Sequence, residues 1–120
     1  MDCFGWCHKL MIFTSNFAKN GSNTNAISIS EKCPDWFYGP EYKKLAPKFW
    51  FFQKYKQNHD EEYYILNYYK EVLSKLDPTQ VLNDLDGKIL LCYEKETEFC
   101  HRFLVADWLK FKLGIEVKEI

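Results

Sequence analysis

The sequence predicts a three-layer α/β sandwich with a small, mostly parallel sheet of about four strands. Residues 89–93 form an apolar run flanked by charged residues, which is typical of a buried strand. A charged loop follows, and residues 99–113 then show helical spacing that ends at Gly114, a residue suited to the end of a helix. Along the whole chain, the order of predicted elements is strand, strand, three helices, strand, helix, strand.

Three further short stretches are predicted to be strands. Residues 10–13 are apolar and precede the polar residues 14–16. Residues 26–30 alternate between isoleucine and serine, so one face of that strand is expected to line something polar. Residues 115–117 are expected to form a final edge strand.

The predicted helices have recognisable first residues. Pro47 suits the first residue of a helix that continues through residues 49–55. Asp60 is expected to cap the next helix, and Asp77-Pro78 to open a short one over residues 79–85. Asp86-Gly87 then makes a turn. The core stripe of the helix after Asp60 is expected to consist of Ile65, Tyr69, Val72, Leu73 and Leu76.

Length and composition indicate one folded domain over residues 1–120. Apolar residues make up 47% of the chain and aromatic residues 18%, which is enough to offset the entropy lost on ordering. Stretches 17–25 and 35–45 have the composition of loops. The net charge of −1 argues against a general binder of nucleic acid or membrane surfaces, because such proteins carry a basic excess.

Cysteine usage and hydropathy bear on the compartment. The sequence has no apolar run near the roughly twenty residues of a membrane span, and we expect no signal peptide. We therefore expect a cytoplasmic protein with reduced thiols. The odd count of five comprises Cys3, Cys7, Cys33, Cys92 and Cys100.

The chemistry is expected where the strand over residues 89–93 ends and the next helix begins, because open α/β sheets bind ligands at the carboxyl ends of their strands. Glu94 follows the strand directly and is a candidate catalytic acid or base, although a solvated charge is the alternative. Lys95 is a weaker candidate for ligand binding. Cys92, inside the strand, is a candidate ligand contact or a core residue.

Cys100, His101 and Arg102 fall in the first turn of the following helix, where free N–H groups favour anions. Arg102 suits phosphate or carboxylate, but it could instead pair with Glu94 or Glu98 and staple the loop. Cys100 should have a depressed pKa and is a candidate nucleophile, metal ligand or buried small residue. His101 is a candidate general base or zinc ligand, or a packing residue. We expect no metal and no cofactor, because Cys-x7-Cys-His is not a standard zinc signature. A zinc site would need Cys92, Cys100 and His101 to converge, with Cys3, Cys7 or His8 as optional further ligands.

Hydroxyl and amide side chains near the other two strands could complete a phosphate or ribose site. They are Thr14, Ser15, Asn16, Ser28 and Ser30, and ordinary turn capping is the alternative. The aromatic residues Trp36, Phe37 and Tyr38 could stack on a flat ring or form a lid over the core.

Several segments resemble the domain-of-unknown-function family numbered 488, in its short bacterial and phage-associated form. They are FTSNFA near residue 13, AISIS-x-x-CPDWF, YKKLAP, and above all LLCYEK followed by FCHRFLVADWL. The resemblance runs from about Leu10 to Glu119 and implies a fold and a site rather than a reaction. The chain departs from the family pattern at residues 29–32, where an Arg is expected and Lys32 could replace it, and in the leader with Cys3, Cys7 and His8.

Two functions of different classes remain open. The first is a pocket for an anionic, nucleotide-like ligand or nucleic-acid end, bound only or hydrolysed as well. The second is an interaction or regulatory module in which the CHR segment is structural, and a thiol redox role for Cys92 and Cys100 is a third possibility. Walker, GxGxxG, HExxH and GxSxG motifs are absent. No membrane partner is expected, and a homodimer is left open.

Overall fold

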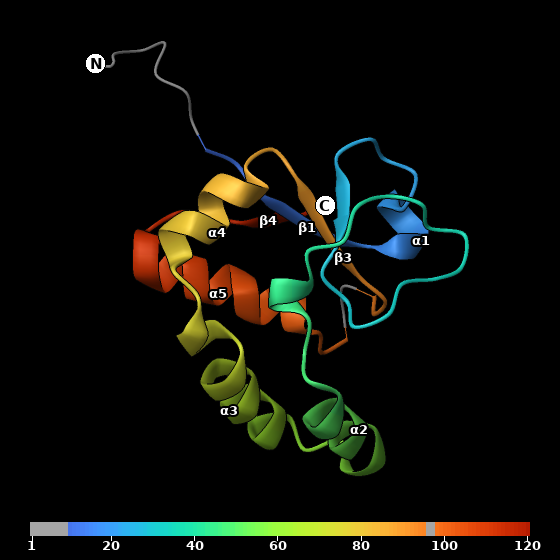
Figure 1. Ribbon diagram of the computed structural model, residues 1–120, viewed down its shortest axis with the longest axis vertical. Helices are drawn as coiled ribbons and strands as arrows, with labels where there is room; N and C mark the ends of the chain where they lie inside the picture. The colour runs from blue at the N-terminus through green and yellow to red at the C-terminus, as the bar shows by residue number, and fades with distance from the viewer. Residues whose placement is uncertain (1–9, 96–97) are drawn as a thin grey trace.

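The computed structural model describes residues 10–95 and 98–120, and its centre is a four-stranded parallel sheet (Figure 1). The strands lie in the order β2-β3-β1-β4, so β3 and β1 are central and β4 is an edge strand. This confirms the predicted α/β class and the parallel sheet. The strands are β1 (Phe13–Asn16), β2 (Ala26–Ser28), β3 (Ile89–Cys92) and β4 (Lys118–Glu119).

Helices cover both faces of the sheet. The long α5 packs on β1 and β3 from one side, and the single-turn α1 contacts the same strands from the other. Helices α2 and α3 pair with each other and extend away from the sheet (Figure 1). Helix bounds are α1 (Phe17–Asn20), α2 (Phe49–Asn58), α3 (Glu61–Glu71), α4 (Pro78–Leu85) and α5 (His101–Leu113), with 3-10 turns at Lys43–Leu45 and Leu73–Lys75. No helix within the described ranges is long and apolar enough to cross a membrane.

Two apolar cores lie on opposite faces of the sheet because side chains alternate along a strand. Leu90 of β3 belongs to the larger core, together with Val105 of α5. Ile89 and Leu91 belong to the smaller core, with Phe17 of α1. Burial on both faces explains why β3 is apolar at every position.

The predicted helix ends are largely confirmed. The Asp60 carboxylate accepts a hydrogen bond from the backbone N–H of Tyr63, and that of Asp77 accepts one from Thr79. Gly114 ends α5 in the left-handed conformation, with φ 69°, as its position predicted. Gly87 has φ 81° in the turn before β3.

Several element boundaries differ from expectation. Strand β2 ends at Ser28 rather than at residue 30, and α5 begins at His101 rather than at residue 99. Strand β1 begins at Phe13, so the polar residues 14–16 are part of the strand rather than following it. Helix α1 lies inside the segment expected to be a loop, α2 begins at Phe49 rather than Pro47, and β4 follows residues 115–117. The polar side chains of residues 14–16 can be buried in β1 because other parts of the chain supply their hydrogen-bond partners.

The first two positions of the predicted core stripe are each displaced by one residue, from Ile65 and Tyr69 to Tyr64 and Tyr68. Tyr64 and Tyr68 are buried, whereas Tyr69 is 36% exposed and Ile65 is half-buried. The hydroxyl of Tyr68 donates to the Leu45 carbonyl at 2.7 Å, so this buried polar group keeps a hydrogen-bond partner. Val72 and Leu73 are buried as predicted.

Candidate functional site

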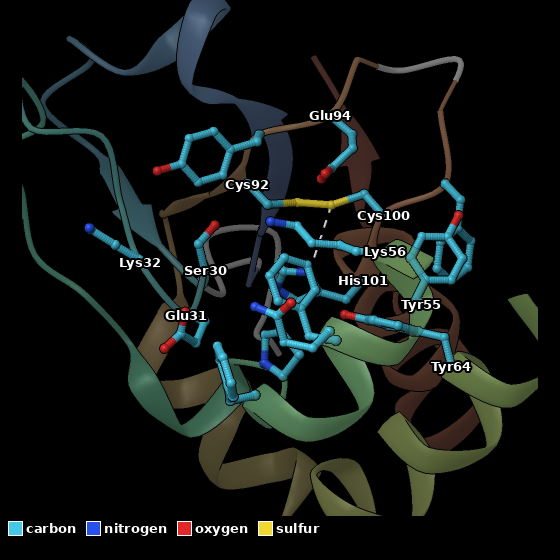
Figure 2. Close-up of a pocket in the computed structure, with 16 residues that line it drawn as sticks. Ser30, Glu31, Lys32, Tyr55, Lys56, Tyr64, Cys92, Glu94, Cys100 and His101 are labelled. Carbon is cyan, nitrogen blue, oxygen red and sulfur yellow. Dashed lines mark hydrogen bonds between the residues drawn. A yellow bond between two sulfur atoms is a disulfide. The ribbon is translucent and has the colours of Figure 1, made fainter. Parts of the chain in front are cut away.

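A cavity of about 440 Å³ opens at the carboxyl ends of β2 and β3, beside the first turn of α5 (Figure 2). Its polar groups come from the segment after β2, from the end of β3 and from α2 and α5. Six aromatic residues line it: Phe49, Phe52, Tyr55, Tyr64, Tyr93 and Phe99. The place matches the expected edge of the sheet.

Cys92 and Cys100 form a disulfide at the wall of the cavity. The expectation of reduced thiols is therefore wrong for this pair. The reason is geometric: Cys92 ends β3, Cys100 is the N-cap of α5, and their Cα atoms lie 7.3 Å apart. Cys33 is a free cysteine.

His101 is the first residue of α5 and also lines the cavity. Its Nε2 lies 2.7 Å from the carbonyl oxygen of Ile29. A carbonyl only accepts, so Nε2 carries the proton and the Nδ1 lone pair faces Cys100 Sγ at 3.8 Å. Burial lowers the pKa of His101 to about 4, so the ring is neutral at pH 7.

Glu94 lies on the side of the disulfide opposite His101 (Figure 2). Burial raises the pKa of its carboxyl above the ordinary value, while the charges of Arg102 and Lys56 oppose that shift. The structure thus brings together five sequence-predicted residues at one cavity: Ser30, Cys92, Glu94, Cys100 and His101.

Arg102 does not line the cavity. Its side chain is wholly buried and makes a bidentate contact with Glu119, with Nε–Oε1 and Nη2–Oε2 distances of 3.1 and 3.0 Å. Its Nη1 donates to Cys92 Sγ at 3.2 Å. The guanidinium is therefore held by β4, rather than by Glu94 or Glu98.

The polar residues of β1 also lie away from the cavity. Thr14 Oγ1 donates to Glu119 at 2.6 Å, and Ser15 Oγ donates to the Ile120 carbonyl at 2.9 Å. Asn16 caps α1 through Lys19 N–H. These three buried side chains have structural partners.

Two serines near β2 differ in their environment. Ser28 Oγ accepts a hydrogen bond from the backbone N–H of Ser30. Ser30 Oγ lines the cavity, is buried, and has no hydrogen-bond partner within residues 10–95 and 98–120. Lys95 is exposed and is not part of the cavity wall.

The sequence interpretation missed the wall formed by α2. Phe49, Phe52, Gln53 and Lys56 line the cavity and recur at helical spacing, so they share one face of the helix. Lys56 lies over the Phe52 ring at 4.9 Å from its centroid. The helical spacing of these residues can be seen in the sequence. The sequence does not show that this face of α2 lines a cavity.

The aromatic residues after Pro34 lie elsewhere. Phe37 is buried in the smaller core against Phe17, with ring centroids 5.2 Å apart, so it covers the core as the lid interpretation had it. Trp36 and Tyr38 are 52% and 92% exposed. None of the three lines the cavity described above.

The sequence model of a family described as the active DUF488-N3 subclade matches residues 15–113. The chain belongs to the DUF488 family. This confirms the resemblance inferred from the CYEK and CHR segments, while the bacterial or phage form stays a prediction. No curated protein and no solved structure matched the sequence. In this DUF488 protein, Lys32 lines the cavity.

Proposed function

We propose that the cavity binds a small anionic ligand with a planar ring, such as a nucleotide, and that Glu94 is the residue that acts on it. The observation that carries the proposal is the composition of one cavity: aromatic walls, two lysines, the carboxyl groups of Glu31 and Glu94, and an unpartnered serine hydroxyl. The description of the matching subclade as active accords with a chemical role.

The aromatic wall suits a flat ring. Phe52 and Tyr55 of α2 and Phe99 before α5 are half-buried, so each leaves part of its ring accessible to a ligand. Tyr55 and Phe99 already contact each other, with ring centroids 5.2 Å apart. An inserted ring would gain offset or edge contacts with these side chains.

The lysines suit the anion. Lys32 and Lys56 are exposed at the cavity, and neither makes an ion pair with another described residue. A phosphate between them would gain charge-assisted hydrogen bonds. This assigns the anion contact to lysines, because the guanidinium of Arg102 is already committed to Glu119.

Binding is tested by thermal shift and calorimetry on the oxidised protein with a nucleoside monophosphate, the bare nucleoside and ribose 5-phosphate. We expect the monophosphate to bind best, and Lys56→Ala to weaken it about tenfold. Lys54→Ala is the matched control, since Lys54 is exposed on the same helix and outside the cavity. Absence of any ligand effect, or equal binding by the two variants, contradicts the proposal.

Hydrolysis is tested separately by following ligand breakdown during long incubation. If Glu94 acts as acid, base or nucleophile, Glu94→Gln removes turnover, and Glu98→Gln, an exposed neighbour outside the cavity, keeps it. Bound ligand that is never consumed would indicate a binding protein without turnover.

The alternative, an interaction module with a structural CHR segment, is favoured by one observation. Arg102 is wholly buried and paired, so this residue of the segment serves the fold. Failure of all three ligands in the binding experiment would leave this alternative as the better account.

A further inference from the structure

Three potential metal ligands converge at the cavity wall. The sulfur atoms of Cys92 and Cys100 and a ring nitrogen of His101 all lie within 4.8 Å of one another. All three residues are buried and line the cavity. In the structure the two sulfurs share a disulfide, so both are unavailable as ligands until that bond is reduced.

His101 is already oriented as a ligand. Its Nε2–H donates to the Ile29 carbonyl at 2.7 Å, which leaves the Nδ1 lone pair directed at Cys100 Sγ. Metal-bound imidazoles commonly hold their ring in this way, with the second nitrogen donating to a backbone carbonyl.

Positively charged or positively polarised groups lie beside both sulfurs. Arg102 Nη1 donates to Cys92 Sγ at 3.2 Å, and its own charge is balanced by Glu119. Cys100 is the N-cap of the 13-residue α5, where free N–H groups favour negative charge. Two thiolates and one divalent cation would therefore make a neutral buried group.

We propose that reduction converts the disulfide into a zinc site made of Cys92, Cys100 and His101. A dithiol reductant supplies two electrons and two protons, breaking the S–S bond to give two thiols while it becomes a disulfide itself. Zinc then displaces both thiol protons to solvent and takes the Nδ1 lone pair. Two sulfurs and one imidazole nitrogen are a ligand set that favours zinc.

A zinc ion held by these residues would lie at the cavity wall, because all three line the cavity. Water would supply a fourth ligand, as in zinc sites with three protein ligands. The proposal does not depend on the anionic ligand proposed above. It makes metal binding conditional on the redox state, which gives the cavity an oxidised and a reduced form.

The test is cobalt titration of reduced protein under anaerobic conditions, in a Cys3→Ser/Cys7→Ser background because the leader also offers ligands. We expect one equivalent of Co²⁺ with a thiolate-to-cobalt charge-transfer band that zinc removes. Cys33→Ser, the matched control, keeps the band, whereas Cys92→Ser and Cys100→Ser lose it. Oxidised protein is expected to bind no cobalt.

Folding is checked by circular dichroism for every reduced sample. A second measurement needs no variant at the site: zinc should protect Cys92 and Cys100, but not Cys33, from alkylation. The proposal is overturned if folded, reduced protein binds no cobalt, if oxidised protein binds it equally, or if either serine variant retains the band. Since the nucleotide experiment uses oxidised, metal-free protein, the two proposals fail separately.

Discussion

The wholly buried guanidinium of Arg102 forms a two-pronged contact with the carboxylate of Glu119, with Nε–Oε1 at 3.1 Å and Nη2–Oε2 at 3.0 Å. The same carboxylate accepts a hydrogen bond from Thr14 Oγ1 at 2.6 Å. One acidic side chain therefore links α5, the edge strand β4 and the central strand β1. Both this link and the backbone pairing with β1 hold the short strand β4 at the edge of the sheet.

Glu119→Ala is expected to lower the free energy of unfolding by about 3 kcal/mol, because it leaves a buried guanidinium without its counter-charge. The estimate is at the low end for buried pairs because the Glu119 side chain keeps 24% of its surface exposed. Urea denaturation measures the change. Glu116→Ala is the control on an exposed neighbour, and equal effects of the two changes would contradict the structural role.

Replacing both Arg102 and Glu119 should lower the free energy of unfolding less than removing Glu119 alone. In Arg102→Met/Glu119→Leu, no charge is left unpaired, and apolar replacement of a buried pair is often close to neutral. We expect the double variant to unfold at higher urea concentration than Glu119→Ala. A double variant less stable than Glu119→Ala would show that packing of Arg102 matters more than its charge.

Much of the fold was predictable because its signals are local. Asp60, Asp77 and Gly114 set helix ends through hydrogen bonds and backbone conformation within a few residues. The stripe of α3 was misplaced because the burial of Tyr68 depends on the distant Leu45 carbonyl, which no local pattern reveals.

The candidate site also has one part that local sequence predicts and another that depends on distant packing. Cys92, Glu94 and Cys100 were predictable together because one strand–loop–helix unit carries them. Arg102 was not, since successive helix residues point about 100° apart and the segment's position on the helix does not say which faces the cavity. The contribution of α2, including Lys56, depends on how α2 packs, and this lies outside any local window.

Ser30→Ala is expected to raise the stability of the ligand-free protein by up to about 1 kcal/mol, because it removes a buried hydroxyl without a partner among the described residues. It should also weaken binding of the nucleoside monophosphate. Ser28→Ala is the matched comparison: its hydroxyl accepts from Ser30 N–H, so the change should cost about 1 kcal/mol. Equal effects at both positions would refute the distinction.

The buried hydroxyl of Tyr68 is expected to make the folded protein less stable in alkaline solution. Burial raises the pKa of its hydroxyl well above 10, the ordinary value, whereas the unfolded chain loses the proton near 10. Above pH 10 the unfolded state therefore binds fewer protons, and stability falls as pH rises.

Urea midpoints between pH 7 and 11 measure this effect. Tyr68→Phe should cost about 1–2 kcal/mol at pH 7 through the unpaired Leu45 carbonyl, and should flatten the alkaline decline. Some decline should persist, because burial also raises the pKa of Tyr64. Parallel curves for wild type and variant would mean that Tyr68 contributes nothing to the titration.

The Cys92–Cys100 bond is expected to stabilise the metal-free protein by about 2–3 kcal/mol. The bond closes a loop between residues 8 apart in the sequence, which lowers the conformational entropy of the unfolded chain. Dithiothreitol in the presence of a chelator should lower the urea midpoint accordingly. Cys33→Ser should respond like wild type, since Cys33 is not disulfide-bonded. Cys92→Ser/Cys100→Ser should start at the lower midpoint and respond to neither reagent. If dithiothreitol leaves the wild-type midpoint unchanged, the bond adds nothing to stability.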